Sequence, residues 1–433
     1  MRKIFNYIHN DLYLEVLCFI LFVLSFCFEP IKDVFIGYGK ILTNDSILLT
    51  DYVYIGGIGA TLLNVASVLL FNILLLKILK IKTTGAVYCG IIMIFGFSFF
   101  GKNLINTLPI YLGIWLYSRF KHVPFRSLII TILLSTGISP LISYCFFGFG
   151  LAWYFALPLG LLCGIVVGFI VPAYSAHTLA FHEGYNLYNT GFALGIVSAI
   201  FYAIFKMCGL DVSTVQRYDG TNSTVFYVLL GSISLAFILI AIIGDRGVFK
   251  KYFNMLKTSG RLISDYVKDF GVEAVLLNFG ILGIILFTLF ISCGIPMNGI
   301  LFGSILAILG VSAFGLHVRN GIPVWIGCTF AILIMMAVRG DFSIDINRDM
   351  SLLVAFVFAS ALAPISGKFG IIYGIAGGII HMALTPIAVS LQGGFDLYNN
   401  GFAAGFEASV LAICGDKIFH KEKKRNARKS KNL

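Results

Sequence analysis

Charged residues are scarce in this chain, and their scarcity excludes a water-soluble globular protein. Only 12% of the 433 residues are charged, 59% are hydrophobic, and the mean hydropathy is +0.94. A soluble domain of this composition would have almost no polar cover on its surface. Apolar runs of roughly 17 to 25 residues, each long enough to cross a bilayer as a helix, recur along the chain. We therefore predict an all-α integral membrane protein.

Motifs of catalysis and metal binding are also lacking. The sequence has no His-Glu-x-x-His, no Gly-x-Ser-x-Gly and no paired aspartates within an apolar run, so the usual nucleophile and metal sets of an enzyme are missing. The nine cysteines lie singly in or near apolar runs, without the paired spacing of zinc or redox sites. We expect no enzyme activity, no metal and no cofactor.

Basic residues outnumber acidic residues by 31 to 20, but they do not form one nucleic-acid-binding patch. They cluster in short segments between apolar runs and in the tail from Lys417 to Lys431. This distribution indicates membrane orientation and contact with anionic lipid headgroups, so the expected partner is the lipid bilayer and not a nucleic acid. The first apolar run, Tyr13 to Phe28, lacks a small-residue cleavage pattern, and we expect it to be a retained helix.

Apolar windows predict about fourteen membrane spans. These begin near residues 13, 54, 84, 104, 127, 151, 190, 224, 273, 297, 322, 350, 370 and 401. An even count places both termini on one side, and the positive-inside rule makes that side the cytoplasm, together with the basic stretch from Arg246 to Lys268. The loops around Asp45, Asp211 to Asp219 and Arg339 to Asp349 would face outside. We expect a multi-pass protein of the plasma membrane with both termini cytoplasmic.

An internal repeat divides the chain into two related parts. The block from Gly96 to Gly113 recurs 214 residues later, from Gly310 to Gly327, and the block from Gly160 to Gly195 recurs 210 residues later, from Gly370 to Gly405. The repeat pairs the second to seventh spans with the ninth to fourteenth. Because a displacement of seven spans is odd, the second copy is inverted in the membrane. A miscount by one span would make the copies parallel instead.

The predicted organisation follows from this repeat. It comprises an N-terminal segment with the first span at 1–53, repeat A at 54–207, an extra span and basic linker at 208–272, repeat B at 273–415, and a basic cytoplasmic tail at 416–433. The predicted fold is thus two inverted-topology repeats with broken or re-entrant helices.

One stretch of each repeat is too polar for a continuous apolar helix, namely Ala173 to Thr190 in the first and Ile387 to Asn400 in the second. Each follows a proline, Pro172 or Pro386, and each ends in Leu-Tyr-Asn-x-Gly-Phe-Ala-x-Gly. Non-helical backbone at membrane depth survives only where protein or a water-filled cavity satisfies its polar groups. We therefore expect a broken or re-entrant helix in each repeat.

The polar residues of these motifs are the candidate solute-binding residues. Asn189 and Asn399 would cap the helices that follow, whose free N–H groups would face a solute. An interfacial turn would explain the Tyr-Asn pairs equally well, and the glycines would serve close helix packing. The two Asn-x-x-Pro segments would either unwind a span towards the same axis or simply begin a helix. The candidates are Tyr188, Asn189, Gly191, Tyr398, Asn399, Gly401, Asn106 and Asn320.

Ionisable residues near the spans have no counterpart in the other repeat. Glu407 lies about six residues, or roughly 9 Å, inside the last span, where a carboxylate is costly unless it is protonated or holds Na⁺ or a basic partner. We predict that Glu407 couples H⁺ or Na⁺ to solute movement; a place in the headgroup layer or a neutral hydrogen bond to a neighbouring helix is the alternative. Lys102 and Arg319 are expected at the interface. Further candidates are His381, His177, His182 and Glu183.

The duplicated Leu-Tyr-Asn-x-Gly-Phe-Ala-x-Gly segments, and the chain as a whole, resemble a family of bacterial integral membrane proteins of unknown function. The duplication also resembles the layout of urea channels and several secondary transporters, but the urea channels' Leu-Pro-x-x-Thr-x-Pro-Phe motif is missing. The main hypothesis is a permease, in particular a secondary transporter, for a small polar or anionic solute, with its path between the repeats. The alternatives are a passive urea-type channel, an intramembrane enzyme and a sensor. A homo-oligomer is left open.

Overall fold

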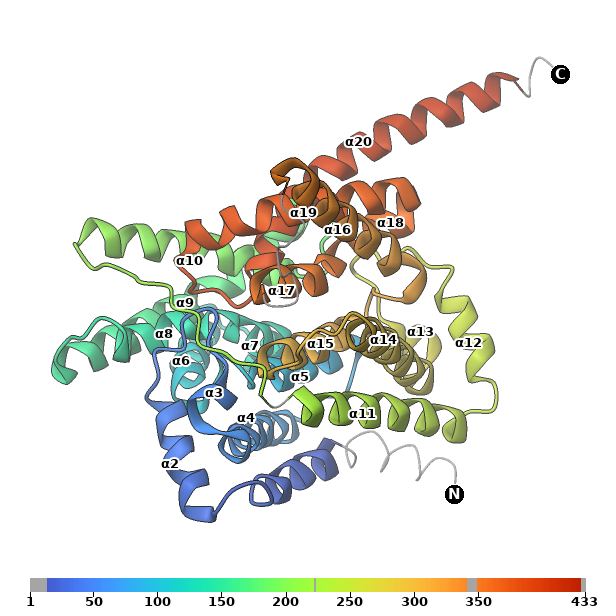
Figure 1. Cartoon of the computed structure of the whole chain (residues 1–433). Coiled ribbons are helices and arrows are strands. Elements are labelled where there is room, and N and C mark those ends of the chain that lie inside the picture. Colours follow the sequence, from blue (N-terminus) through green and yellow to red (C-terminus); the bar gives the residue numbers. More distant parts are fainter. Residues whose placement is uncertain (1–13, 222, 341–348, 430–433) are drawn as a thin grey trace.

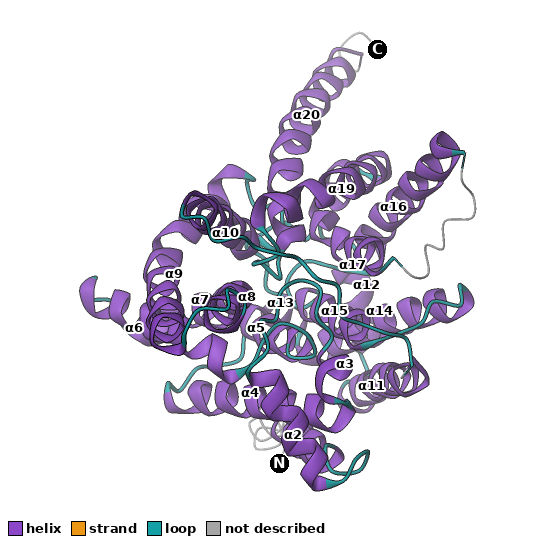
Figure 2. Cartoon of the chain, turned by 60° about the vertical axis from the view of Figure 1, so that its left-hand side comes forward, coloured by secondary structure: helices purple, strands orange, loops and turns teal. Residues whose placement is uncertain are grey.

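The chain folds as a bundle of helices joined by irregular connections (Figures 1 and 2). The structure is a computed structural model that describes residues 14–221, 223–340 and 349–429. Within these ranges, nine helical segments are long and apolar enough to cross a membrane, and three further apolar helices are shorter. The predicted all-α membrane protein is confirmed at this level, whereas the count of fourteen spans and the inversion stay predictions. Most of the predicted outer loop from Arg339 to Asp349 lies outside the described residues.

The first part of the chain forms a short helix over Leu14–Leu24 and then nine labelled α-helices: α2 (Ile31–Leu42), α3 (Tyr52–Gly56), α4 (Ile58–Ile78), α5 (Gly85–Phe97), α6 (Leu104–Phe120), α7 (Ile129–Ser135), α8 (Ser139–Phe147), α9 (Trp153–Phe181) and α10 (Asn189–Met207). A short 3₁₀ turn, η2 (Thr136–Ile138), separates α7 from α8.

The second part begins after α11 (Ser223–Gly244) and repeats the same order of elements. Its helices are α12 (Val248–Met255), α13 (Tyr266–Phe270), α14 (Val272–Ser292), α15 (Gly299–Val311), α16 (Val318–Arg339), α17 (Met350–Phe358), α18 (Ala363–Phe369), α19 (Ile371–Gln392) and α20 (Asn399–Lys429), with the 3₁₀ turn η4 (Ala359–Leu362) between α17 and α18.

Apolar side chains cover the outside of the bundle as well as its interior. Large exposed hydrophobic residues include Leu162 on α9, Val228 on α11 and Ile334 on α16. Such a surface is expected where lipid, and not water, surrounds the helices. In contrast, α5 and α15 are buried along almost their whole length and lie side by side in the middle of the molecule (Figures 1 and 2).

The two central helices run antiparallel. A Cβ atom added to Gly96 of α5 would meet Ala307 of α15, while one added to Gly310 would meet Cys89 and Ile92, so residue numbers rise along one helix as they fall along the other. Small residues at this contact let the two backbones approach closely. The two parts of the chain therefore meet across a pair of oppositely directed equivalent helices.

Equivalent contacts recur in the two parts at the predicted spacing of 214. Asn64 and Asn278 both donate side-chain hydrogen bonds to two carbonyl groups in the connection that follows α5 or α15. Gly57 and Gly271, which begin α4 and α14, both have a φ near +90°. Gly57 lies in the predicted repeat A, whereas Gly271 lies in the segment that we assigned to the linker, so the correspondence begins before the predicted start of repeat B at residue 273.

Each part also caps a central helix of the other part. The Asp51 carboxylate accepts a hydrogen bond of 3.0 Å from the backbone N–H of Gly299, the first residue of α15. Reciprocally, the Asp265 carboxylate accepts one of 2.9 Å from the N–H of Gly85, the first residue of α5. Carboxylates suit these positions because the first N–H groups of a helix lack intrahelical partners and carry partial positive charge. Neither central helix is capped by its own half alone.

The predicted breaks in the helices are shorter than expected. Both prolines lie inside helices, Pro172 within α9 and Pro386 within α19, and helix continues to Phe181 and Gln392. The predicted non-helical stretches of 173–190 and 387–400 shrink to residues 182–188 and 393–398. Helices in protein interiors tolerate proline where side chains and neighbours satisfy the freed backbone groups. At α19 the Thr385 hydroxyl donates to the carbonyl of His381 within this turn.

Candidate functional site

The two broken segments meet where α10 and α20 begin. Leu187 donates its backbone N–H to the carbonyl of Ala361 in η4, and Leu397 donates to the carbonyl of Gly137 in η2, at 3.0 and 2.9 Å. Each break is thus held by the 3₁₀ turn of the other half. From this crossing α10 leads to the left and α20 to the upper right in Figure 1. Residues that are 210 positions apart are thereby brought together in one central region.

Glycines allow this crossing to be close. A Cβ atom added to Gly191 would lie 2.8 Å from the Cβ of Tyr398, and one added to Gly401 would lie 2.7 Å from the Cβ of Tyr188. Both distances are too short for real side chains, so only glycine fits. The packing alternative for these two glycines is therefore what the structure shows, although Gly191 also lines a cavity.

The residues that cap the breaks are Asn186 and Asp396, which the sequence analysis did not select. The Oδ1 atom of each accepts a hydrogen bond of 2.9 Å from the backbone N–H of the tyrosine two positions later, Tyr188 or Tyr398. This is the Asx-turn geometry, and an Asn or Asp two residues before the tyrosine in both copies was its signal. Asn186 also donates to the carbonyl of Gly401, whereas the second carboxylate oxygen of Asp396 is buried without a hydrogen-bond partner.

Asn189 does not cap α10, contrary to the prediction. It is the first residue of the helix, and its side chain points back to α9. Its Oδ1 accepts hydrogen bonds from Thr178 and from Nε2 of His182 at 3.0 and 2.9 Å, and its amide donates to the carbonyl of Ser175 at 2.9 Å. Asn189 therefore closes the break between α9 and α10.

A first cavity, of about 270 Å³, lies on one side of the crossing. It is lined by both predicted tyrosines and by Asn189, Thr190 and Gly191 from the first half. The second half contributes the connection between α12 and α13, through Leu262, Ile263 and Ser264. The walls are mainly apolar, with the tyrosines and the start of α10 as the polar part.

A second cavity, of about 550 Å³, is the counterpart of the first. Asn399 and Asn400 line it in place of Asn189 and Thr190, and Leu48 and Leu49 line it in place of Leu262 and Ile263. The remaining wall includes Thr214 and Gln216 from the connection between α10 and α11. Each cavity is therefore built from the broken helix of one half and an irregular connection of the other half.

The prediction that Lys102 lies at the membrane interface is wrong. Its side chain is fully buried, and it is the only Lys or Arg among the buried residues that the structure describes. The ammonium donates a hydrogen bond of 2.7 Å to the Tyr398 hydroxyl and lies 5.1 Å from the centre of the Phe97 ring. Asp396 is the acidic group within electrostatic range of this ammonium. Lys102 therefore belongs to the central region beside the first cavity.

The structure pairs two predicted residues that we had considered separately, Glu407 and His381. Glu407 Oε2 lies 3.1 Å from His381 Nδ1, and His381 Nε2 lies 3.0 Å from Asn400 Oδ1. Both side chains of the ion pair are completely buried, and Glu407 Oε1 has no hydrogen-bond partner. Glu407 is thus enclosed by protein and contacts the neighbouring helix α19.

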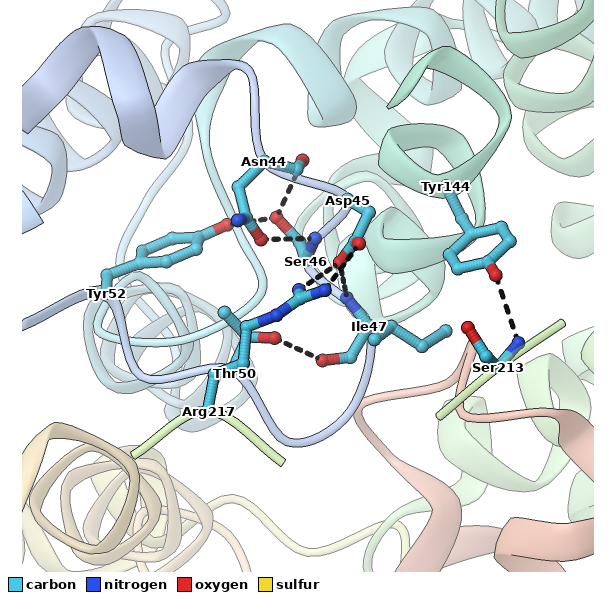
Figure 3. Close-up of polar contacts among 9 residues, drawn as sticks. All are labelled: Asn44, Asp45, Ser46, Ile47, Thr50, Tyr52, Tyr144, Ser213 and Arg217. Atoms are coloured by element: carbon cyan, nitrogen blue, oxygen red, sulfur yellow. Dashed lines mark hydrogen bonds and ion pairs between the residues drawn. The ribbon is translucent and has the colours of Figure 1, made fainter. Parts of the chain in front are cut away.

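The connection between α10 and α11 lines the second cavity through Thr214 and Gln216, and Figure 3 shows its Arg217 beside Asp45. Arg217 makes two hydrogen bonds to the Asp45 carboxylate, at 2.6 and 2.9 Å, and its backbone pairs with Leu49 and Asp51. The hydrogen bond to Asp45 raises the pKa of the Arg217 guanidinium above its ordinary value, so the guanidinium stays charged. Next to Leu262 of the first cavity, the Arg261 guanidinium lies 3.4 Å from the Glu183 carboxylate and also donates to the Glu183 backbone carbonyl.

The sequence comparison with known families covers most of the chain. The profile of the family described as "Protein of unknown function (DUF1576)" matches residues 31–207 and 245–415. The chain belongs to this family. The two matched ranges begin 214 residues apart, which equals the displacement of the repeat. No curated protein and no solved structure matches the chain.

The other predicted residues of this DUF1576 member have structural roles or lie on its surface. Asn106 and Asn320 each complete a capping box at the start of α6 or α16, so the helix-start interpretation of the Asn-x-x-Pro segments holds. His182 is buried in the break, whereas His177, Glu183 and Arg319 are exposed. In the described ranges, no three His, Cys, Asp or Glu residues form a group that could hold a metal.

Proposed function

We propose that this protein is a secondary transporter for a small polar or anionic solute, with its path through the two cavities between the halves. The observation that carries this proposal is the pair of equivalent cavities on either side of one glycine-lined crossing. A substrate site between two repeats, formed by broken helices, is typical of secondary transporters. The proposed fold is fourteen spans in two inverted repeats.

The antiparallel contact of α5 and α15 supports the inversion, since equivalent helices that run in opposite directions need a two-fold axis in the membrane plane. The first cavity includes the basic connection between α12 and α13, and the second includes the connection between α10 and α11. The positive-inside rule places the former in the cytoplasm and the latter outside. The cavities then serve opposite faces of the plasma membrane, with both termini cytoplasmic.

The central side chains support a polar or anionic solute. The Lys102 ammonium is a buried cation with one hydrogen-bond partner, Tyr398, whose ring lines the first cavity. The asparagine pair of the second cavity offers amide groups. A rotation of the halves about the crossing, with release of the Arg217–Asp45 or the Arg261–Glu183 pair, would open one cavity at a time. We therefore assign the coupling role to Glu407 and solute contact to Tyr188, Tyr398 and Asn399.

Uptake by the purified protein in liposomes tests this proposal. Lactate, succinate, glutamate, inorganic phosphate and urea serve as radiolabelled probes under an imposed pH or Na⁺ gradient. We expect gradient-driven accumulation of at least one anion, and equilibration of urea without accumulation would favour the channel instead. Flux of none of the probes above that of protein-free liposomes would contradict the transport proposal.

Asn399→Ala and Asn189→Ala provide a matched pair of variants. Asn399 makes one side-chain hydrogen bond, to Asn400, and lines the larger cavity, so its variant should keep the melting temperature and lose uptake. Asn189 makes three side-chain hydrogen bonds, each worth about 0.5 to 1.5 kcal/mol, so its variant should lose stability first. Equal loss of stability in both variants would remove Asn399 from the solute path.

A further inference from the structure

The buried pair of His381 and Glu407 lies directly behind the wall of the second cavity. Met382 and Thr385, the residue next to His381 and the one a turn later on α19, line the cavity, as does Asn400. Asn400 accepts from His381 Nε2 at 3.0 Å, so one amide side chain separates the imidazole from the cavity. The histidine and the carboxylate are themselves completely buried.

The hydrogen bonds around Asn400 determine where the protons lie. The Asn400 amide nitrogen donates to Asn399 Oδ1 at 3.0 Å, so its Oδ1 faces His381 and can only accept. His381 Nε2 therefore carries hydrogen. The contact of 3.1 Å between Nδ1 and Glu407 Oε2 is then a hydrogen bond only if one further proton lies between these two atoms.

This count makes the observed pair electrically neutral. With the shared proton, the pair is either neutral histidine with glutamic acid or imidazolium with carboxylate. Loss of that proton leaves a carboxylate facing the lone pair of Nδ1, with a net charge of −1 in an apolar interior. Glu407 Oε1 has no hydrogen-bond partner, which a carboxylate tolerates far less well than a neutral or paired group does. The geometry of the pair therefore fits the proton-loaded form.

The arrangement suits H⁺ better than Na⁺. A hard cation requires several oxygen ligands. Here an imidazole nitrogen occupies one oxygen of Glu407, and no group of three His, Cys, Asp or Glu side chains that could hold a metal occurs in the described part of the chain. Among the helices packed against α19 and α20, namely α10, α16, α17 and α18, the titratable group that interacts with Glu407 is the Cys328 thiol of α16, which is uncharged at neutral pH.

We propose that His381 and Glu407 together form a proton-binding site, loaded from the second cavity, which makes this protein a proton-coupled carrier of an anionic solute. This inference rests on the proposed transport function and names its coupling ion. The proton enters past Asn400, binds as an N–H on His381 or an O–H on Glu407, and leaves when the site is exposed to the other side. Symport of one proton with a monoanion moves no net charge.

Proton binding can be tested without knowing the solute. Infrared difference spectra of the purified protein, recorded between acidic and alkaline pH, should contain the carbonyl band of a buried carboxylic acid. Asp51 and Asp396 are buried acids as well, so Glu407→Gln should remove one component of that band and leave theirs. His381→Gln should retain the Glu407 component and shift its pH midpoint, because the shared proton loses its imidazole partner. Asp416→Asn, which changes a partly exposed acid on the same helix, is the matched control and should leave the band unchanged. Replacing choline with Na⁺ should not move the midpoint.

Transport then tests the coupling. For whichever of the five radiolabelled probes accumulates, one pH unit should support about tenfold accumulation, since one pH unit is a tenfold ratio of proton activity. Glu407→Gln should abolish this accumulation and keep exchange of labelled for unlabelled solute. A band unaffected by Glu407→Gln, or a midpoint that moves with Na⁺, would overturn the proton site even if transport is found. If the band behaves as expected but no probe is transported, the proposed function fails and the proton-binding site stands.

Discussion

At the scale of single residues, several buried positions carry an ionisable group in only one of the two halves. Equivalent positions pair an ionisable residue in one half with a neutral residue in the other: Lys102 with Leu316, Asp396 with Asn186, His182 with Gln392, His381 with Val171, and Glu407 with Val197. The neutral member shows what the fold alone accepts at that position. The ionisable member is costly at membrane depth, and such residues in spans are a default indication of function.

The pair of Lys102 and Asp396 can be exchanged for the residues of the other half. Lys102→Leu alone should destabilise the protein by roughly 1 to 3 kcal/mol, because the Tyr398 hydroxyl loses its donor and Asp396 loses its nearby cation. Adding Asp396→Asn should restore part of this loss, because Asn186 occupies the equivalent site without a lysine. Thermal unfolding in detergent measures both variants and Asp396→Asn alone. Strictly additive effects would show that the two groups do not interact.

The burial of Lys102 was not predictable from the local sequence. Lysine at the end of an apolar run usually reaches to the headgroups. However, α5 has only 13 residues, or about 20 Å of helix, which is too short for the roughly 30 Å of hydrocarbon. The connection after α5 therefore lies inside the protein, where Asn64 binds the Lys102 carbonyl. In contrast, Tyr188-Asn189 and Tyr398-Asn399 could be selected from the sequence because the same two residues occur in both repeats.

At the scale of elements, the sequence located the breaks but not their length. Proline and polar residues both predicted that α9 and α19 would stop early, and both helices continue past the prolines. Their neighbours decide this, because α6 packs along α9 and α16 packs along α19. A local sequence pattern does not reveal which helix will pack alongside. The glycines of the motif were correctly associated with close packing, since small residues four positions apart indicate a helix contact.

The contact between α10 and α20 should tolerate no methyl group. Gly191→Ala and Gly401→Ala each place a Cβ atom within 2.8 Å of a tyrosine Cβ across the crossing, and we expect a loss of about 1 to 3 kcal/mol from overpacking. Gly39→Ala on α2 is the control, because a Cβ atom there meets nothing within 4 Å. Melting temperatures of the three variants provide the comparison. A Gly191→Ala protein as stable as the control would mean that the helices separate easily.

At the scale of the whole molecule, composition and repeat spacing predicted the fold class and the duplication. They could not predict which contacts join the halves, because hydrogen bonds such as those from Gly299 to Asp51 and from Leu187 to Ala361 connect residues far apart in sequence. The cavities arise from those contacts, since each takes walls from both halves. The sequence of either repeat alone therefore could not predict the cavities.

Cysteine labelling tests the orientation of the two cavities. In a background without the nine native cysteines, Ile263→Cys lies at the first cavity and Thr214→Cys at the second, and both positions are exposed. A membrane-impermeant maleimide should label Thr214→Cys in intact cells and Ile263→Cys only after permeabilisation, because the basic connection is expected to be cytoplasmic. The cysteine-free parent is the control. Labelling of both positions in intact cells would rule out the inverted arrangement.

The reciprocal carboxylate caps have a consequence for biogenesis. Asp265, whose carboxylate accepts from the first N–H of α5, lies 180 positions after Gly85 and has not been synthesised when α5 is inserted. Likewise, Asp51 is synthesised before Gly299 of α15, whose backbone N–H donates to it. A newly inserted first half has the hydrogen bonds from Val53 to Asp51 and from Val87 to Thr84, but it lacks the partners of the second Asp51 oxygen and of the Gly85 N–H. The two halves must then assemble as one cooperative unit. If translation stops after α11, we expect the truncated protein to be degraded.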